Sequence, residues 1–352
     1  MILTRTPFRV TLGGGTGLPS YFSRHGGFVL AMGLDKYMYI SLNVPLVDRM
    51  IRVQYMRSEM VDHPDQLKHE LAREALKRHE IWSQIEVTST ADLPAGSGVG
   101  SSSCYLVGLL AALHAYRRRP GSPAELAEEA SAIELGTLRQ PIGKEDQYMA
   151  AFGGMSVLDI ARDGSVVHRY ANVPISSLPD FIANVHLYWT GIRRSVPEIL
   201  RDQYLAMEDP TSPQHPVVEE ALHGIKDVGL QSLAAIEAGN FDEFGQLMDR
   251  HWNFKKRLSP RVTIPGFDEL YAELRDRFGV LGAKVCGPGG GGFVMVYAPA
   301  RHADVTRFMA ERGLKRLHYN IEFEGVKVIT NTTPYAGGYT PEVVGHQPVR
   351  AG

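Results

Sequence analysis

Three glycine-rich stretches lie far apart along this chain of 352 residues, at 13–15, 96–100 and 287–292. Glycine adopts backbone conformations that other residues avoid, and it lets another group come close to the main chain. The first stretch follows a strand pattern at Phe8 to Leu12, the second opens an apolar helical run at Ser101, and the third joins two strand patterns. These positions favour a fold of mixed helices and strands with three close-contact loops at the ends of its elements.

The remaining pattern of apolar residues predicts a protein of mixed α and β structure, arranged as two domains or as one large α/β unit. Strands are expected at 8–12, 28–30, 37–40, 85–88, 155–159, 166–169, 185–189, 283–286, 293–297 and 326–330, and helices at 65–79, 101–116, 123–135, 196–207, 217–238, 241–256 and 304–312. A chain of this length is comfortable for two hydrophobic cores. We expect an N-terminal domain at 1–178, a C-terminal domain at 179–335 and a tail at 336–352, where glycine and proline are frequent.

Charge and hydropathy argue against several classes of protein. The formal net charge is −2 and charges of both signs are interspersed, so nucleic acid is not an expected partner. The longest nearly uncharged apolar run, Tyr105 to Tyr116, is about half of the roughly 20 residues that span a membrane, so no membrane helix is expected. The N-terminus lacks an apolar signal segment, which makes a cytoplasmic protein the expectation. Cys104 and Cys286 are too far apart in sequence for a CxxC metal site.

The second glycine stretch has the pattern of an anion site. Its alternate glycines let backbone N–H groups converge, and the helix that follows adds free donors and the positive end of its dipole. We expect it to bind a nucleotide triphosphate through Pro94, Gly96, Ser97, Gly98, Val99, Gly100, Ser101, Ser102 and Ser103. The serine hydroxyls could also ligate Mg²⁺, because hard cations prefer oxygen. The alternative is a flexible loop that merely caps the helix.

Two common nucleotide-binding motifs do not account for these stretches. The pattern GxxxxGK[ST] is absent from the chain, and Gly143-Lys144 is followed by Glu145. The third stretch contains a formal GxGxxG, but its glycines run into a predicted strand, where a dinucleotide fingerprint would open a helix. An ordinary P-loop enzyme and an NAD or FAD site are therefore both disfavoured.

Acidic and basic residues suited to phosphoryl transfer occur elsewhere in the chain. This reaction needs the attacking hydroxyl to be oriented, its proton to be accepted, a metal to be held and the developing charge to be met by cations. Asp146, Glu134 and Arg9 are candidates for these tasks. Taken singly, each of them could equally be a surface charge or a helix cap.

Taken together, the motifs resemble the GHMP kinase superfamily, which is named for galactokinase, homoserine kinase, mevalonate kinase and phosphomevalonate kinase. The matching segments are 7–16, 94–103 and 284–292, and segments 143–154, 188–195 and 251–256 are similar to the branch of D-glycero-D-manno-heptose 7-phosphate kinases. The resemblance implies the GHMP kinase fold. In that fold an N-terminal, ATP-binding domain like ribosomal protein S5 domain 2 is followed by a ferredoxin-like α+β domain, with the active site between them.

The resemblance also implies roles for individual residues. Asp146 would be the catalytic base, Arg9 would lie near the acceptor hydroxyl, and Ser102 and Glu134 would hold Mg²⁺. ATP would place its triphosphate along the backbone from Gly96 to Ser101. The residues expected to face the substrate are Gly14, Gly15, Thr16, Gly17, Asp146, Arg193, Gly289, Gly290 and Gly291.

One departure from the resemblance concerns the substrate. After Gly-Gly-Gly-Thr, sugar kinases of this kind usually carry an aspartate that binds substrate hydroxyls, and this chain has Gly17. Loss of that carboxylate would change which epimer or which phosphorylated sugar fits. A terminal phosphate on the sugar would need cations, for which the candidates are Arg139, Lys144, Arg193, Arg194, Lys255 and Lys256. Arg193 is favoured because it follows a strand end at Thr190-Gly191.

The sequence thus predicts an ATP- and Mg²⁺-dependent kinase that acts on a small sugar or sugar phosphate. The preferred reaction transfers the γ-phosphate to the anomeric hydroxyl of D-glycero-D-manno-heptose 7-phosphate and gives the 1,7-bisphosphate. One alternative is an anomeric kinase of an unphosphorylated sugar, like galactokinase or fucokinase. Another, motivated by Gly17, is a sensor that binds ATP and sugar without turnover. A monomer and a homodimer are both compatible with the sequence.

Overall fold

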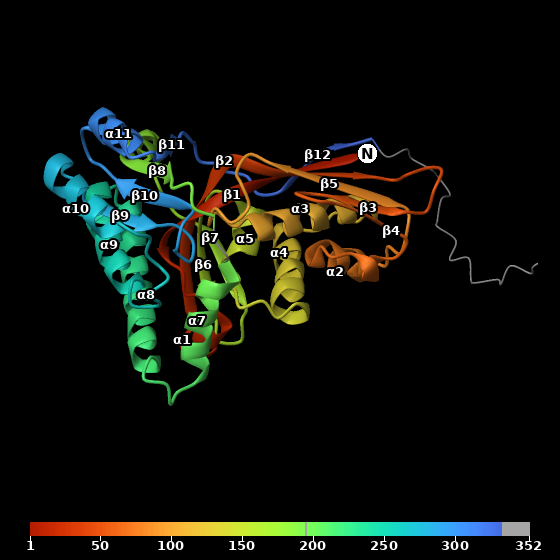
Figure 1. Ribbon diagram of the computed structural model, residues 1–352, viewed down its shortest axis with the longest axis horizontal. Coiled ribbons are helices and arrows are strands. Elements are labelled where there is room, and N and C mark those ends of the chain that lie inside the picture. The colour runs from red at the N-terminus through yellow and green to blue at the C-terminus, as the bar shows by residue number, and fades with distance from the viewer. Residues whose placement is uncertain (194–195, 333–352) are drawn as a thin grey trace, which may run out of the picture.

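The computed structural model describes residues 1–193 and 196–332, which form two β-sheets with helices packed on them (Figure 1). The first sheet has eight strands: β1 (Ile2–Gly14), β2 (Gly27–Asn43), β3 (Ile51–Gln54), β4 (Ser58–Val61), β5 (Ile85–Ala91), β6 (Met155–Ile160), β7 (Val166–Tyr170) and β12 (Lys327–Asn331). Its main path runs β12-β1-β2-β5-β3-β4, and β6 pairs with both β2 and β7. The α+β class predicted from the sequence is therefore confirmed.

Strand β2 is one long strand where the sequence predicted two short ones. Phe8 of β1 pairs with Leu34 and the preceding Pro7 pairs with Tyr37, so Asp35 and Lys36 form a bulge. Proline has no N–H to donate to a strand ladder, and a bulge accommodates such a position without ending the strand. The polar bulge interrupts the alternation of apolar residues, which is why the pattern suggested a break.

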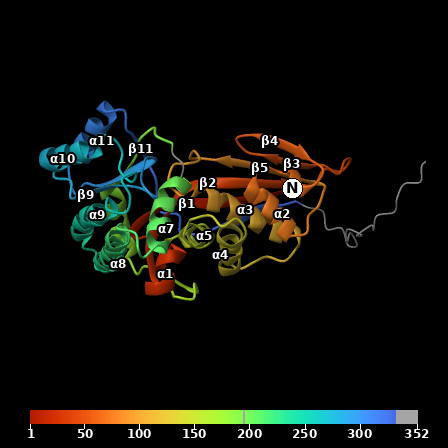
Figure 2. The ribbon, with the colours of Figure 1, turned by 60° about the horizontal axis from the view of Figure 1, so that its bottom comes forward.

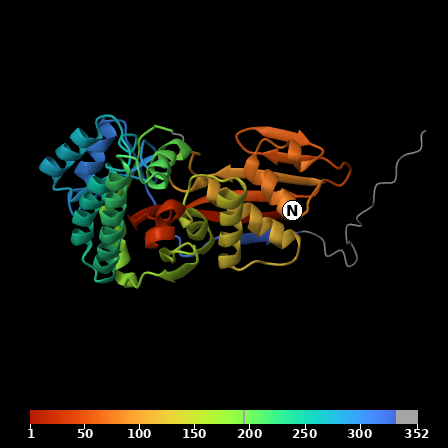
Figure 3. The same cartoon turned by 90° about the horizontal axis from the view of Figure 1, so that it is seen from below.

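Four helices cover one face of this sheet, as the view from below shows (Figure 3). They are α2 (Glu70–Arg78), α3 (Ser101–Tyr116), α4 (Pro123–Ser131) and α5 (Glu145–Phe152). Helix α3 is buried on nearly every side and has the predicted bounds. Helix α4 begins at Pro123, as predicted, and Ser122 and Glu125 form a capping box at its start. At Ala132 the helix changes into a wider π-helical turn, η2 (Ala132–Thr137).

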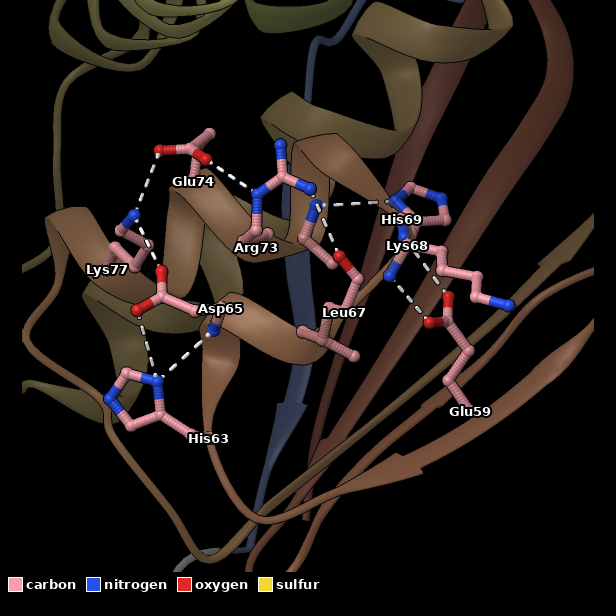
Figure 4. Close-up of polar contacts among 10 residues, drawn as sticks. Glu59, His63, Asp65, Leu67, Lys68, His69, Arg73, Glu74 and Lys77 are labelled. Atoms are coloured by element: carbon pink, nitrogen blue, oxygen red, sulfur yellow. Dashed lines mark hydrogen bonds and ion pairs between the residues drawn. The ribbon is translucent and has the colours of Figure 1, made fainter.

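The start of α2 lies further along the chain than the predicted residue 65. Pro64–Gln66 forms a separate 3₁₀ turn, η1, and the ring of His69 caps the helix by accepting from the N–H of Ala72 at 3.3 Å. The carboxylate of Glu59 on β4 accepts from the backbone N–H groups of Lys68 and His69 at 2.6 and 3.1 Å (Figure 4). These bonds fix the non-helical turn before α2, and apolar spacing alone does not reveal them.

The second sheet is antiparallel and has the strand order of a ferredoxin-like domain. Its strands are β8 (Val185–Trp189), β9 (Gly282–Val285), β10 (Phe293–Tyr297) and β11 (Lys315–Leu317), in the order β11-β8-β10-β9. The second half of the chain also contains α7 (Val196–Glu208), α8 (His215–Glu237), α9 (Phe241–Lys255), α10 (Phe267–Phe278) and α11 (His302–Glu311). Helix α9 packs against β9 of this sheet, and α8 packs against α9 and against strands β1 and β2 of the first sheet (Figure 2).

The last described strand returns to the first sheet. Strand β12 pairs antiparallel with β1, with Ile2 opposite Asn331, so the closing strand expected near 326–330 lies beside the first strand. Short helices α1 (Pro19–His25), η3 (Ile175–Ser177) and α6 (Leu178–Asn184) complete the described elements. The division of the chain at residue 178 stays a proposal, and the predicted tail at 336–352 lies outside the described residues. Among the described helices, none combines the length and apolar character of a membrane span.

A buried histidine on β8 predicts a measurable acid sensitivity. The His186 side chain bonds the Tyr188 hydroxyl and the Ala183 carbonyl, and burial, helped by the nearby positive charge of Arg316, lowers the pKa of His186 to about 3. Below about pH 6.5 the unfolded chain therefore binds a proton that the folded protein does not bind. Because of His186, the free energy of unfolding should fall by about 1.4 kcal/mol for each pH unit between about pH 6.5 and pH 4.

Denaturant unfolding of the wild type and of His186→Gln between pH 7 and 4 checks this. The variant should lose less stability over that range, because glutamine does not titrate and can still donate to the Ala183 carbonyl. Equal pH dependence in the two proteins would contradict the assignment of a neutral His186 in the folded state.

Candidate active site

The three glycine stretches meet between the two sheets. The N–H of Phe293, which follows the third stretch, donates to the Ser97 carbonyl of the second at 3.3 Å. The buried ammonium of Lys284 donates to the Leu12 carbonyl at 2.8 Å, and His251 of α9 bonds the Gly14 carbonyl at 3.0 Å. Segments nearly 300 residues apart in sequence thus form one site lined by both halves of the chain.

The second stretch connects β5 to α3 and has the backbone geometry of an anion-binding turn. Gly96, Gly98 and Gly100 have φ values of 76°, 78° and 82°, which only glycine adopts without strain. No side chain caps the start of α3, so the N–H groups of its first turn are not closed off by a cap. Ser97 and Ser103 are buried, Ser101 is half-buried and Ser102 is exposed. The cradle for a triphosphate stays a prediction, and this geometry suits it.

Arg9 and Asp146, two of the predicted site residues, lie in direct contact between β1 and α5. Nε of Arg9 donates to Oδ1 of Asp146 at 2.6 Å, and a second guanidinium nitrogen donates to the Gly98 carbonyl at 2.9 Å. Burial acts to lower the pKa of Arg9, but the adjacent Asp146 outweighs it and raises that pKa. The Asp146 side chain is 24% exposed, and no described residue donates a hydrogen bond to its Oδ2, so the role of Asp146 as a base stays a prediction.

Glu134 lies beside the start of α3 in a setting that suits a metal ligand. Its Oε2 accepts from Ser103 at 2.8 Å and from Gln147 at 2.6 Å, while the buried Oε1 has no partner among the described residues. Burial raises the pKa of Glu134 to about 7, although the bonds from Ser103 and Gln147 lower it in part. Ser102 is exposed and lies close enough to Glu134 to help lower its pKa, so the Ser102 hydroxyl and the buried Glu134 oxygen together suit a hard cation such as Mg²⁺.

The first glycine stretch approaches the site mainly through its backbone. A side chain at Gly14, where φ is 68°, would collide with the Phe28 carbonyl. The hydroxyl of the fully buried Thr16 accepts from the Phe28 N–H at 2.9 Å and donates to the Phe28 carbonyl at 3.2 Å. The sequence predicts that Thr16 faces a substrate. In the structure its hydroxyl is used within the protein, where it holds the turn against Phe28. Gly17 is buried, and its carbonyl accepts from the Lys144 N–H at 3.3 Å.

The third stretch is anchored to two neighbouring segments. The N–H of Gly290 donates to the Val262 carbonyl at 2.6 Å, and the N–H of Gly292 donates to the Ile192 carbonyl at 2.9 Å. Arg193 directly follows Ile192 and is exposed. The structure thus places the glycines at 289–291 and Arg193 near one another, and their contact with a substrate stays a prediction.

Three of the six cations proposed for a terminal phosphate are engaged within the protein. The ammonium of Lys144 donates hydrogen bonds to both carboxylate oxygens of Glu128 at 2.6 and 2.8 Å. Lys255 donates to the Val285 and Gly287 carbonyls at 2.7 and 2.5 Å, and Lys256 pairs with Asp268 at 3.2 Å. Arg139 is exposed, and Arg194 lies outside the described residues. A separate cavity of about 700 Å³ beside Asn184 and Tyr297 contains none of the predicted site residues.

The contact between Gly292 of the third stretch and Ser97 of the second predicts the effect of replacing Gly292. Gly292 has a φ of 79°, and a Cβ there would collide with the Ser97 carbonyl. Gly292→Ala should therefore displace the loop at 94–100, raise the KM for ATP several-fold and cost about 1–3 kcal/mol of stability through backbone strain and the collision.

Gly239→Ala is the matched control, because Gly239 has a similar φ of 75° but no atom within 4 Å of its Cβ position. Initial-rate kinetics and thermal unfolding of both variants separate the collision from the strain. Equal KM values for ATP in the two variants would contradict the proposed link between the loops.

Comparison with known proteins gives consistent matches. The chain matches the GHMP kinases N terminal domain over residues 67–154 and the GHMP kinases C terminal over residues 232–313. It is 25% identical over 342 residues to the D-glycero-alpha-D-manno-heptose 7-phosphate kinase of Campylobacter jejuni, which covers 93% of this chain and 98% of the relative. It is 29% identical over 228 residues to the L-fucokinase/L-fucose-1-P guanylyltransferase of Bacteroides fragilis, which covers 64% of this chain and 23% of that relative.

A solved structure is similar over nearly the whole chain. The crystal structure of a D-glycero-D-manno-heptose 1-phosphate kinase from Bacteroides thetaiotaomicron matches with a TM-score of 0.76 at 21% identity. The match covers 95% of this chain and 100% of the other.

Proposed function

Because this chain belongs to the GHMP kinases and is an ATP-dependent sugar kinase, we propose that it phosphorylates the anomeric hydroxyl of D-glycero-D-manno-heptose 7-phosphate to give the 1,7-bisphosphate. The observation that carries this substrate is the likeness to the heptose 7-phosphate kinase, which spans 93% of this chain and 98% of that relative. The branch-like segments at 143–154, 188–195 and 251–256 support the same choice.

The geometry of the site supports a division of labour in this reaction. The backbone at 94–101 and the start of α3 bind the triphosphate of ATP. Asp146 accepts the proton of the attacking hydroxyl at Oδ2 while Arg9 holds Oδ1, which keeps the carboxylate oriented. Ser102 and Glu134 would hold Mg²⁺, which neutralises charge on the β- and γ-phosphates when bound. The cation Arg193 is the residue assigned to the 7-phosphate.

A kinase of an unphosphorylated sugar is the second candidate. It is favoured by the engagement of Lys144, Lys255 and Lys256 within the protein and by the 29% identity to the L-fucokinase-containing relative. With these cations occupied, fewer charges are available for a second phosphate on the substrate.

The proposal is tested by ATP consumption against heptoses, hexoses and their terminal phosphates with Mg²⁺ present, with the product position read by ³¹P NMR. An anomeric phosphate on heptose 7-phosphate alone is the expected result. Turnover of a free sugar would replace the proposed substrate with the second candidate. No turnover of any sugar in the panel would favour the sensor.

A further inference from the structure

Glu145 opens helix α5 immediately before Asp146, and its carboxylate lies against two glycines. A Cβ built on Gly17 would collide with Oε2 of Glu145 and would lie 3.2 Å from its carboxyl carbon. A Cβ built on Gly143 would collide with the same oxygen. The carboxylate of Glu145 therefore occupies the space that a side chain at position 17 would fill.

This carboxylate oxygen has no structural partner. Oε2 of Glu145 is shielded from solvent and has no hydrogen-bond partner among the described residues. A buried polar oxygen without a partner costs stability, and the neighbouring carboxylate of Asp146 adds repulsion. The carboxylate of Glu134 also has an unpaired oxygen, but two side chains bond its other oxygen in place. An unpartnered acceptor next to the catalytic base calls for a ligand that supplies the missing donor.

We propose that Glu145 is a specificity-determining residue whose carboxylate takes the place of the side chain missing at Gly17 and accepts hydroxyl hydrogens of the acceptor sugar. The inference rests on the proposed function, because it requires a sugar beside Asp146. Burial and then the charge of Asp146 raise the pKa of Glu145, so the two carboxyl groups lie close together. The ligand group is therefore a hydroxyl near the one that is phosphorylated.

The chemistry of a carboxylate suits this role. Its two oxygens can accept from neighbouring hydroxyls at the same time, and a sugar presents hydroxyls on adjacent carbons. A site built around such acceptors rejects a sugar whose hydroxyl points elsewhere, because the acceptors are then left unpaired. Glu145 takes no proton in this scheme, because the base remains Asp146, whose orientation Arg9 fixes.

The arrangement predicts that a carboxylate at position 17 can replace the carboxylate at position 145 in binding the sugar. Gly17 has no positive φ, so aspartate can adopt its backbone conformation. The test compares the wild type, Glu145→Gln, Gly17→Asp and the double variant Gly17→Asp/Glu145→Ala, using whichever sugar of the panel the wild type phosphorylates fastest. The KM for sugar, the KM for ATP, kcat and the melting temperature are measured for each protein.

Glu145→Gln should raise the KM for sugar by at least about tenfold, which is the usual effect of losing a charged acceptor for a substrate hydroxyl. Its KM for ATP should stay within about twofold and its melting temperature should be equal or higher, because an unpaired buried charge is removed. Gly17→Asp should lose sugar affinity and stability, because its side chain meets Glu145. The double variant should recover the sugar KM of the wild type to within a few-fold, because alanine at 145 frees the space that the new aspartate carboxylate at position 17 then fills.

An unchanged sugar KM in Glu145→Gln would overturn the inference. A lower melting temperature with equal changes in both KM values would also overturn it, since that pattern marks a structural role. A stable double variant without recovery would refute the exchange of positions. The proposed function is tested separately, by which sugar the wild type phosphorylates. Whatever that sugar is, the ratio of the variant's sugar KM to that of the wild type still measures the role of Glu145. If the wild type phosphorylates no sugar, both proposals fall.

Discussion

Asp146→Asn should lower kcat by roughly 10²- to 10⁴-fold, the usual contribution of a general base. Asparagine keeps an oxygen that can accept from Arg9, so the geometry at Oδ1 is preserved. It replaces the other oxygen with an amide that cannot take the proton of the attacking hydroxyl. Initial rates at saturating ATP and sugar measure the change, and the KM for ATP should stay close to that of the wild type.

Stability has to be followed in the same experiment, because Arg9 is 4% exposed and its main partner is Asp146. A neutral residue at 146 weakens that pair, so a lower melting temperature is expected. Asp159→Asn on strand β6 is the matched control, since Asp159 is exposed and lies outside the site. A kcat for Asp146→Asn near that of the control would remove Asp146 from the mechanism.

Glu134→Gln should raise the Mg²⁺ concentration needed for half-maximal rate by at least about tenfold. Glutamine has nearly the same shape and can still accept from Ser103, so the local packing is preserved. It lacks the negative charge that a hard divalent cation prefers. The rate is measured against free Mg²⁺ at saturating substrates, and equilibrium dialysis of Mg²⁺ gives a readout that does not depend on turnover.

The control for this change is Glu208→Gln, because Glu208 is exposed at the end of α7. It should leave the Mg²⁺ dependence unchanged. If Glu134→Gln behaves like this control, Glu134 is not a metal ligand. If the wild type is fully active in excess chelator, the Mg²⁺ assignment itself is wrong.

The fold was largely predictable from the sequence because glycine marked the turns that define it. The α+β class, the GHMP kinase fold and the ferredoxin-like order of the second sheet are confirmed. The glycine at position 100 correctly predicted the start of α3, since a left-handed residue precedes the first helical turn. Strands β3 and β4 were missed because each is only 4 residues long and carries charge.

Helix α5 was also missed, which hid part of the site. Its 8 residues follow Gly143-Lys144, and its first turn is almost entirely polar, so apolar spacing gave no helical signal. Arg9 and Asp146 were named from the sequence, but their contact joins β1 to α5, 137 residues apart. Gln147, which holds Glu134, and Glu145, which lies against Gly17, belong to the same turn and became evident only in three dimensions.

The pairing of β12 with β1 has a consequence for how the protein is made. The Met1 carbonyl accepts from the Thr332 N–H at 2.9 Å, so the start of β1 is tied to the end of β12, which is synthesised much later. A ribosome producing this chain releases the whole ferredoxin-like half before the edge of the first sheet can be closed. The outer edge of β1 stays an open strand edge until β12 has been synthesised, and open edges invite pairing with other chains. The first sheet is therefore completed only when the ferredoxin-like half is already present.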